Sequence, residues 1–190
     1  MLCAKKGLSK ANGYNRSNNY KIHSEVHLRG LTMSRSVIMS QVRSKQVNNN
    51  GLRVFMGTFT GGVNVHKALA ETAVSRQITT ATFELLGGLH EATFTAYDFE
   101  KQKRLEPIVL KRQLEIVSGH GTISLLDKEP HIHIHMSVSF RDKAYPHGIG
   151  MVGGHIAQAT AFAVEFTLTA YDGEPMHREL HKLTGLKLWQ

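Results

Sequence analysis

The stretch Pro130-His-Ile-His-Ile-His-Met-Ser-Val-Ser-Phe140 alternates polar and apolar residues along most of its length. Alternate side chains of a β-strand point to opposite faces, so the stretch is predicted to be a strand with one continuous apolar face. Its three histidines must then share the other face. A strand of this kind is typical of an antiparallel sheet with one covered side. The apolar face consists of Ile132, Ile134, Met136, Val138 and Phe140.

The rest of the chain predicts more strands of this type, separated by glycine-containing turns, and one helix. The helix is expected over about residues 63–76, because Val65, Leu69 and Ala73 lie four residues apart and form an apolar stripe. One helix among many strands indicates an α+β fold, a strongly bent antiparallel β-sheet or open barrel with one main flanking helix. The other expected strands are residues 53–59, 79–86, 92–97, 113–118 and 161–171.

Charge is distributed unevenly along the chain. The chain has 190 residues and a formal net charge of +8, and residues 1–52 contain nine basic residues but only one acid, Glu25. Residues 53–190 are therefore electrically balanced. They are long enough to form one domain without disulfides, and the single cysteine, Cys3, excludes an internal disulfide. We expect a folded domain over residues 53–190 preceded by a basic, disordered tail.

Three explanations of the basic tail remain open. It is an arm that contacts DNA phosphates, a targeting peptide poor in acids, or sequence upstream of a later start at Met33 or Met39. In the last case residues 1–38 are not part of the working protein. No apolar run reaches the roughly 18 residues that cross a bilayer, and the N-terminus lacks the apolar core of a secretory signal. We therefore expect a cytoplasmic protein without a membrane segment.

The histidine face of the opening strand suggests a metal site. Imidazoles at alternate positions, such as His133 and His135, project in parallel, and neutral imidazole is a common zinc ligand. The spacing alone also fits histidines that only cover a solvent-facing surface. A third ligand is expected beyond the next turn, from His147 or His155. We prefer His155, because the preceding Gly153-Gly154 pair allows backbones to approach closely.

Several motifs occur in a fixed order and together resemble one known family. They are Leu114-Glu-Ile-Val-Ser-Gly-His-Gly-Thr-Ile123, the His-x-His pair after Pro130, Gly153-Gly154-His155-Ile156, and Thr184-Gly-Leu186. This combination resembles the signature of the plant and prokaryote conserved (PPC) domain family, from about residue 53 to residue 189. The resemblance implies a homotrimer of compact α+β subunits. Plant members accompany AT-hooks in nuclear proteins, whereas prokaryotic members usually stand alone and are assigned to DNA binding.

The family is also similar in fold to acetolactate decarboxylase, whose zinc is held by a His-x-His pair and a later histidine. That similarity carries the ligand set over to His133, His135 and His155, with zinc or another divalent transition metal as the expected cofactor. The loop over residues 143–151 looks longer than is usual in the family. It could reshape the mouth of the site or add His147 as a ligand, and the role of His131 stays open.

Three neutral ligands leave the charge of a zinc ion uncompensated, which is typical of catalytic sites. Catalysis also needs a general acid or base. Glu115 and Glu165 lie on expected strands, and Arg112 could stabilise an oxyanion, but nothing in the sequence places them near the histidines. The two glutamates are candidate partners for imidazole N–H groups, with surface charges as the alternative.

Two functions follow from these features. We favour a trimeric binding protein with DNA or a regulatory partner as its target, in which the metal is structural or senses a ligand. The alternative is a zinc-dependent enzyme, a lyase similar to the decarboxylase, that acts on a small carbonyl or carboxylate substrate. The AT-hooks that bind DNA in plant members are absent here, so the sequence assigns neither a DNA site nor an enzyme activity.

Overall fold

The computed structural model describes residues 47–48 and 50–190, which belong to a compact unit, Arg43–Gln190. The start sites proposed at Met33 and Met39, and nearly all of the basic tail, lie outside the described residues. The described part contains no helix long and apolar enough to cross a membrane.

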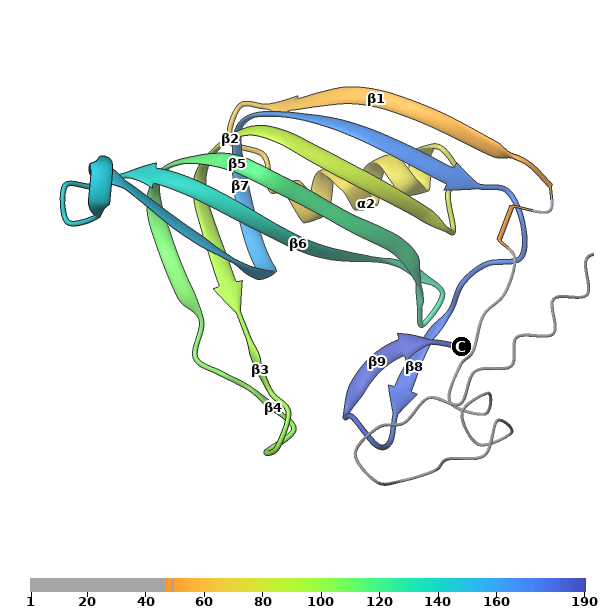
Figure 1. Ribbon diagram of the computed structural model, residues 1–190. Coiled ribbons are helices and arrows are strands. Elements are labelled where there is room, and N and C mark those ends of the chain that lie inside the picture. Colours follow the sequence, from red (N-terminus) through yellow and green to blue (C-terminus); the bar gives the residue numbers. More distant parts are fainter. Residues whose placement is uncertain (1–46, 49) are drawn as a thin grey trace, which may run out of the picture. The chain divides into compact units, whose positions relative to one another are not determined.

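The described elements are nine strands, one α-helix and one short 3-10 helix (Figure 1). In chain order they are β1 (Leu52–Thr60), α2 (Val65–Ser75), β2 (Ala81–Thr95), β3 (Tyr97–Asp98), β4 (Lys103–Arg104), β5 (Ile108–Leu126), β6 (Glu129–Arg141), η1 (Pro146–Gly148), β7 (Ile149–Tyr171), β8 (Arg178–His181) and β9 (Leu186–Trp189).

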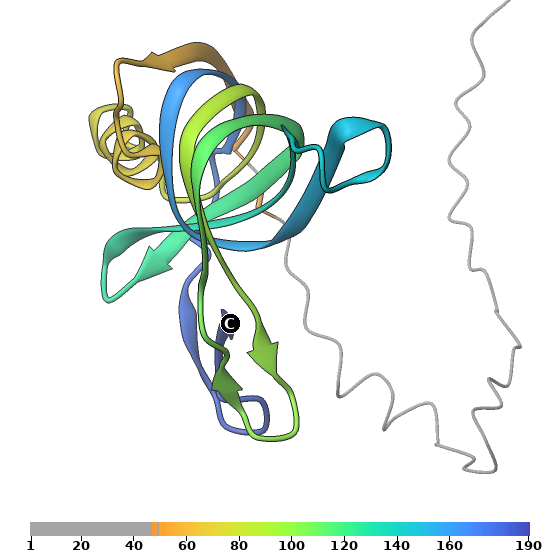
Figure 2. The ribbon, with the colours of Figure 1, turned by 90° about the vertical axis from the view of Figure 1, so that its left-hand side faces the viewer.

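The main sheet is antiparallel and curls into a small barrel, seen almost end-on in Figure 2. Its order is β1-β7-β2-β5-β6, and β6 also pairs with β7, which closes the ring. The ring can close because one edge of strand β7 pairs with two other strands. Its first residues pair with β6, from Ile149 to His155, and its last residues pair with β1, from Ala163 to Tyr171.

The segment just before α2 pairs with the edge of β7 between these two partners. The amide of Gly62 donates to the carbonyl of Ala161 (3.1 Å), and the amide of Ala161 donates to the carbonyl of Val63 (3.0 Å). The side chain of Asn64 accepts a hydrogen bond from the amide of Lys67, which satisfies a free N–H group of the first helical turn. These contacts hold the first turn of the helix beside the middle of β7.

The core lies inside the curled sheet and under the helix. The predicted stripe of Val65, Leu69 and Ala73 is fully buried, and alternate residues of β6 such as Ile134 and Val138 face the same core. The strand and helix patterns therefore predicted the buried faces correctly. Removal of this apolar surface from water is the main stabilising contribution to the fold.

Two hairpins project from the same side of the barrel, β3–β4 and β8–β9 (Figures 1 and 2). Their tips are joined by hydrogen bonds, from the Tyr97 hydroxyl to the Thr184 carbonyl (2.9 Å) and from Gln102 Nε2 to the Leu183 carbonyl (2.7 Å). The second hairpin is attached to β5 through the amide of Leu125, which donates to the carbonyl of Met176. We call this joined pair of hairpins the clasp.

The α+β class and the bent antiparallel barrel are confirmed, but several predicted strands were too short. Residues 79–86 and 92–97 were expected as two strands, whereas β2 runs without a break from Ala81 to Thr95. The Gly87-Gly88 pair forms a β-bulge, with a register shift between Leu85 and Gly87, and does not form a turn. Strand β7 likewise begins twelve residues before the predicted residue 161, because its glycines remain extended within the strand.

Candidate metal centre

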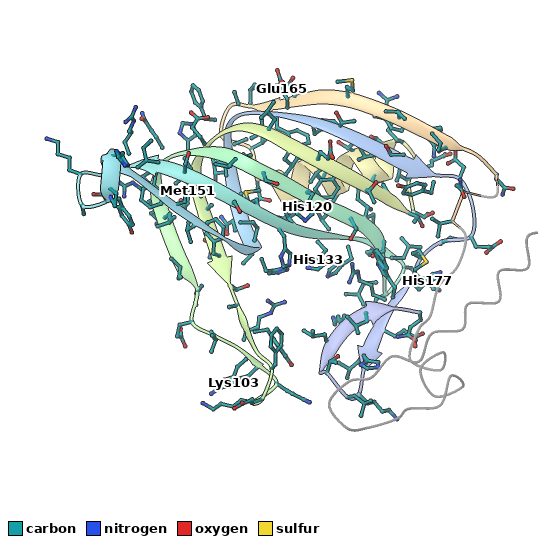
Figure 3. All side chains as sticks on the ribbon, viewed as in Figure 1. Lys103, His120, His133, Met151, Glu165 and His177 are labelled. Atoms are coloured by element: carbon teal, nitrogen blue, oxygen red, sulfur yellow. The ribbon has the colours of Figure 1, made fainter. Side chains whose placement is uncertain are left out.

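Three histidines meet where β6 pairs with β7, on the outer face of the barrel. His135 lies directly opposite His155 in the pairing of β6 with β7, and His133 lies two residues before His135 on the same face of β6. The sheet places their rings close together, with centroids 4.9 to 5.4 Å apart. Figure 3 shows His133 on the side of the barrel that faces the clasp.

One nitrogen from each of these histidines lies within 4.8 Å of the other two. Tetrahedral zinc with bonds of about 2.0 to 2.1 Å needs ligand nitrogens roughly 3.4 Å apart. Small rotations of the rings would close this difference. The donor set also suits the metal, because three neutral imidazoles with no fourth ligand among the described residues would form a site with one open position.

The backbone before His155 depends on glycine. Gly154 has a φ of +152°, a conformation that residues with a side chain rarely adopt. It lies opposite Met136, one pair along from His135 and His155. The glycine therefore allows β7 to bring His155 against β6.

Burial lowers the pKa of all three histidines. It is the largest cause of the pKa of about 4 at His133 and at His155, and it also lowers the pKa of His135. Nearby positive charge adds to this effect, chiefly Arg178 at His133 and Arg104 at His155. All three imidazoles are therefore neutral at pH 7, which is the form that binds a metal.

Arg178 is the nearest cation to His133. It lies at the start of β8, is only 8% exposed, and packs against the Trp189 ring at 5.4 Å. Its Nε donates to Ser124 Oγ (2.8 Å), its Nη1 to the Lys187 carbonyl (3.0 Å) and its Nη2 to Thr122 Oγ1 (3.2 Å). The same Nη2 lies 3.5 Å from His133 Nδ1.

Arg104 approaches from the other hairpin of the clasp. Its Nη1 donates to Thr95 Oγ1 (3.1 Å), and Thr95 lies opposite His155 in the sheet. Each hairpin thus brings one arginine to the histidine cluster, Arg178 beside His133 and Arg104 beside His155.

Two further histidines lie in the same region. Burial lowers the pKa of His66, on α2, and a hydrogen bond with the backbone of Ile156 opposes this change. Burial also lowers the pKa of His131, followed by the charges of Arg178 and Lys187. The Nδ1 atoms of both histidines are buried without a hydrogen-bond partner in the described part of the chain.

Comparison with known proteins identifies the family of this chain. The model of the Plants and Prokaryotes Conserved domain matches residues 46–172, which is more than half of the chain. The chain belongs to this family. This is the PPC family, which the sequence motifs resemble. No curated protein matches the chain significantly.

Solved structures of PPC-like proteins share the fold. A metal-containing protein of Archaeoglobus fulgidus is 28% identical, with a TM-score of 0.66 over 73% of this chain and 93% of its own. A plant- and prokaryote-conserved protein of Pyrococcus horikoshii is also 28% identical, with a TM-score of 0.64 over 73% and 91%. A Ralstonia eutropha protein is 24% identical, with a TM-score of 0.60 over 71% and 89%. The Bacillus subtilis α-acetolactate decarboxylase reaches a TM-score of only 0.43, too low to support an argument.

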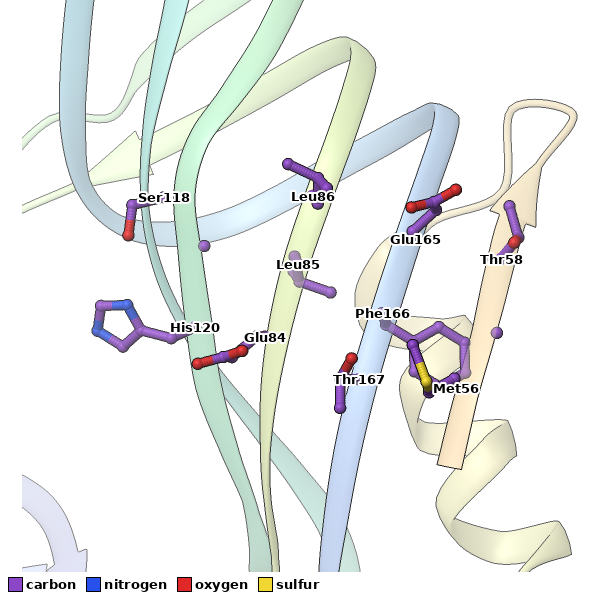
Figure 4. A pocket seen from close by; sticks show the side chains of 12 residues that line it. Met56, Thr58, Glu84, Leu85, Leu86, Ser118, His120, Glu165, Phe166 and Thr167 are labelled. Atoms are coloured by element: carbon purple, nitrogen blue, oxygen red, sulfur yellow. The ribbon is translucent and has the colours of Figure 1, made fainter. Parts of the chain in front are cut away.

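The other site candidates of the PPC domain lie away from the histidine cluster. Glu115 is exposed opposite Ser139, and Glu165 lines a depression of about 800 Å³ on the outer face of the barrel (Figure 4). Figure 3 shows Glu165 and His133 well apart. His147 has a φ of 58° in the exposed turn η1 and does not belong to the cluster.

Arg112 makes its contacts away from the histidine cluster. Its Nη1 donates to Asp142 (3.0 Å), its Nη2 donates to the Arg141 carbonyl (2.8 Å), and its guanidinium lies over the Phe140 ring. The suggestion that Arg112 stabilises an oxyanion thus receives no support. Sequence reasoning missed Arg178 and Arg104 as neighbours of the histidine cluster, and the sequence signal for them was weak, since neither lies in an alternating stretch.

Proposed function

We propose that this PPC-domain protein is a regulatory binding protein whose working centre is a divalent transition metal, zinc or a similar ion, held by His133, His135 and His155. The observation that carries the proposal is the convergence of three neutral imidazoles within 4.8 Å on adjacent strands. The similar protein of Archaeoglobus fulgidus is described as metal-containing, which supports the same assignment. The metal would supply an open coordination position for a ligand from solution.

We favour binding over catalysis. The zinc-dependent lyase considered from the sequence needs a general acid or base beside the metal, and the three-histidine cluster includes no carboxylate among the described residues. Of the glutamates proposed from sequence as partners for the imidazole N–H groups, Glu115 lies opposite Ser139, and Glu165 lies well apart from His133 (Figure 3).

The metal assignment predicts that purified protein retains about one metal ion per chain. Replacement of His133 and His135 together by alanine removes two of three ligands and is expected to abolish retention. Metal content is measured by mass spectrometry after dialysis. The variant His147→Ala, in the exposed turn η1, is the matched control and keeps its metal. Equal metal content in the double variant and the unaltered protein would contradict the site.

We further infer a homotrimer that uses the outer face of the barrel. Met56 and Leu86 are 80% and 61% exposed there and line the same depression, so two large apolar side chains are in contact with water (Figure 4). Replacement of Met56 and Leu86 by glutamate is expected to give folded monomers, measured by light scattering. The variant Phe99→Glu, at an 83% exposed position on the clasp, should leave the mass unchanged. A trimer that survives the double substitution rejects this face as its interface.

DNA binding is the second candidate, favoured by two structural neighbours described as "putative DNA-binding" proteins. Residues 53–190 carry equal numbers of basic and acidic side chains, so any affinity for duplex DNA is expected to depend on the basic residues 1–52. Titration of fluorescent duplex at several salt concentrations tests this, with and without residues 1–38. The shortened protein lacks seven of the nine basic residues of this segment, so undiminished affinity and salt dependence would contradict the dependence on the tail.

A further inference from the structure

Two arginines reach the histidine cluster. Arg178 Nη2 lies 3.5 Å from His133 Nδ1, and Arg104 Nη1 donates to the hydroxyl of Thr95, which lies opposite His155 in the sheet. A metal ion with three neutral ligands adds two further positive charges. The described residues provide no carboxylate in this group to balance them.

Arg178 shows the imbalance most clearly. Its side chain is buried, and none of the ion pairs made by Asp or Glu side chains in the described part of the chain includes it. Its three close hydrogen bonds go to two hydroxyls and one carbonyl, which are neutral acceptors. Burial of a cation is costly, and pairing with an anion reduces that cost.

The contact between Arg178 and His133 adds a chemical constraint. A guanidinium only donates, so the 3.5 Å contact with His133 Nδ1 is favourable only when that nitrogen is unprotonated. A metal bound through Nε2 requires a proton on Nδ1, and a metal bound through Nδ1 takes the same lone pair that Arg178 faces. In both cases metal binding turns this contact into a repulsion between positive groups, and a bound anion would relieve it.

We propose that the centre binds a small oxyanion, a carboxylate or a phosphate group, which coordinates the metal and pairs with the guanidinium of Arg178, while Arg104 contributes from the opposite hairpin. This inference rests on the proposed metal site and names its ligand class. The planar fork of arginine matches carboxylate and phosphate oxygens. Both arginines belong to the clasp, so the two hairpins form the anion-recognising part of the site.

Cobalt(II)-loaded full-length protein provides the test, because the visible absorption of cobalt reports on its ligands. Acetate and inorganic phosphate are the charged probes, and acetamide is the neutral analogue of acetate. We expect acetate, phosphate or both to change the spectrum with saturation, and the stronger of the two identifies the oxyanion. Acetamide should bind more weakly. A spectrum that no oxyanion changes, or that acetamide changes as effectively as acetate, overturns the proposal.

Arginine variants test whether the clasp is responsible for oxyanion binding. Arg178→Gln is expected to weaken oxyanion binding by about tenfold or more, from loss of a charge-assisted hydrogen bond. Arg112→Gln is the matched control, because Arg112 is already paired with Asp142, and its affinity should not change. Equal affinity in Arg178→Gln and the unaltered protein rejects the assignment.

A second variant covers the case in which Arg178→Gln does not fold. Arg104 is exposed on the clasp, and Arg104→Gln is expected to weaken oxyanion binding by a few-fold through loss of charge. Unchanged affinity then rejects the proposal. Metal content is measured in every sample, so a protein without metal refutes the proposed metal centre, whereas a loaded protein indifferent to both arginines refutes only the oxyanion site.

Discussion

At the scale of single residues, His133 and His155 connect the site to the stability of the fold. Burial lowers the pKa of each to about 4, from 6.5 in the unfolded chain. Between these values the unfolded chain binds protons that the folded protein does not. The free energy of unfolding of the metal-free protein is therefore expected to fall as the pH decreases from about 6.5 toward about 4.

Urea denaturation of the metal-free protein at about pH 7.5 and about pH 5 measures this dependence. Substitution of both histidines by glutamine should flatten it, because the two groups that resist protonation are gone. His147→Gln, in the exposed turn η1, is the control and should keep the original slope. If the double variant lost stability toward acid as steeply as the unaltered protein, other groups would dominate the acid response.

Residue patterns predicted the histidines of the candidate site but not the arginines beside them. The alternation in residues 130–140 is a local signal, and it is sufficient to predict that His133 and His135 share one face of the strand. Arg178 and Arg104 could not be found in this way. Their places depend on two hairpins that fold back onto the barrel, and the contact from Arg178 to His133 spans 45 residues of chain.

At the scale of elements, the backbones of β5 and β6 lie close together next to the histidine cluster. Gly121 lies opposite Ile134, and a Cβ atom there would overlap with the His133 carbonyl and the Phe83 ring. Gly121→Ala is expected to destabilise the protein by about 1–3 kcal/mol. It should also weaken metal binding, since β6 must shift to relieve the overlap.

Thermal and chemical denaturation measure the effect of Gly121→Ala, with metal content determined in the same samples. Gly88→Ala on β2 is the matched control, because the nearest atom to its Cβ would be Phe162 Cδ1 at 3.5 Å, an ordinary contact. A Gly121→Ala protein as stable as the Gly88→Ala protein would show that the strands separate here at little cost.

Glycines also explain why the elements were only partly predicted. A glycine pair reads as a turn in a sequence, yet Gly87-Gly88 and Gly153-Gly154 both lie inside long strands. The curl of the barrel needs bulges and close backbone contacts at these points, which only the assembled sheet reveals. The helix was predicted within two residues of its ends because its apolar stripe of Val65, Leu69 and Ala73 is a local signal.

At the scale of the whole molecule, residues 1–38 are expected to be dispensable for folding. The described barrel begins at Leu52, and the family model matches from residue 46. A protein that begins at Met39 should melt cooperatively and keep its metal, measured by calorimetry and mass spectrometry. Loss of cooperative melting would show that residues 1–38 take part in the fold. The cytoplasmic location and the disordered tail remain predictions.

The pairing of β7 with both β1 and β6 has a consequence for synthesis on the ribosome. Among the described strands, β1 pairs only with β7, and Leu52 finds its partner at Tyr171. The first of the described strands to be translated must therefore wait until the end of β7 has emerged, with an unpaired edge and apolar side chains exposed. Such distant pairings fold slowly. The barrel is thus completed only after Tyr171 has left the ribosome.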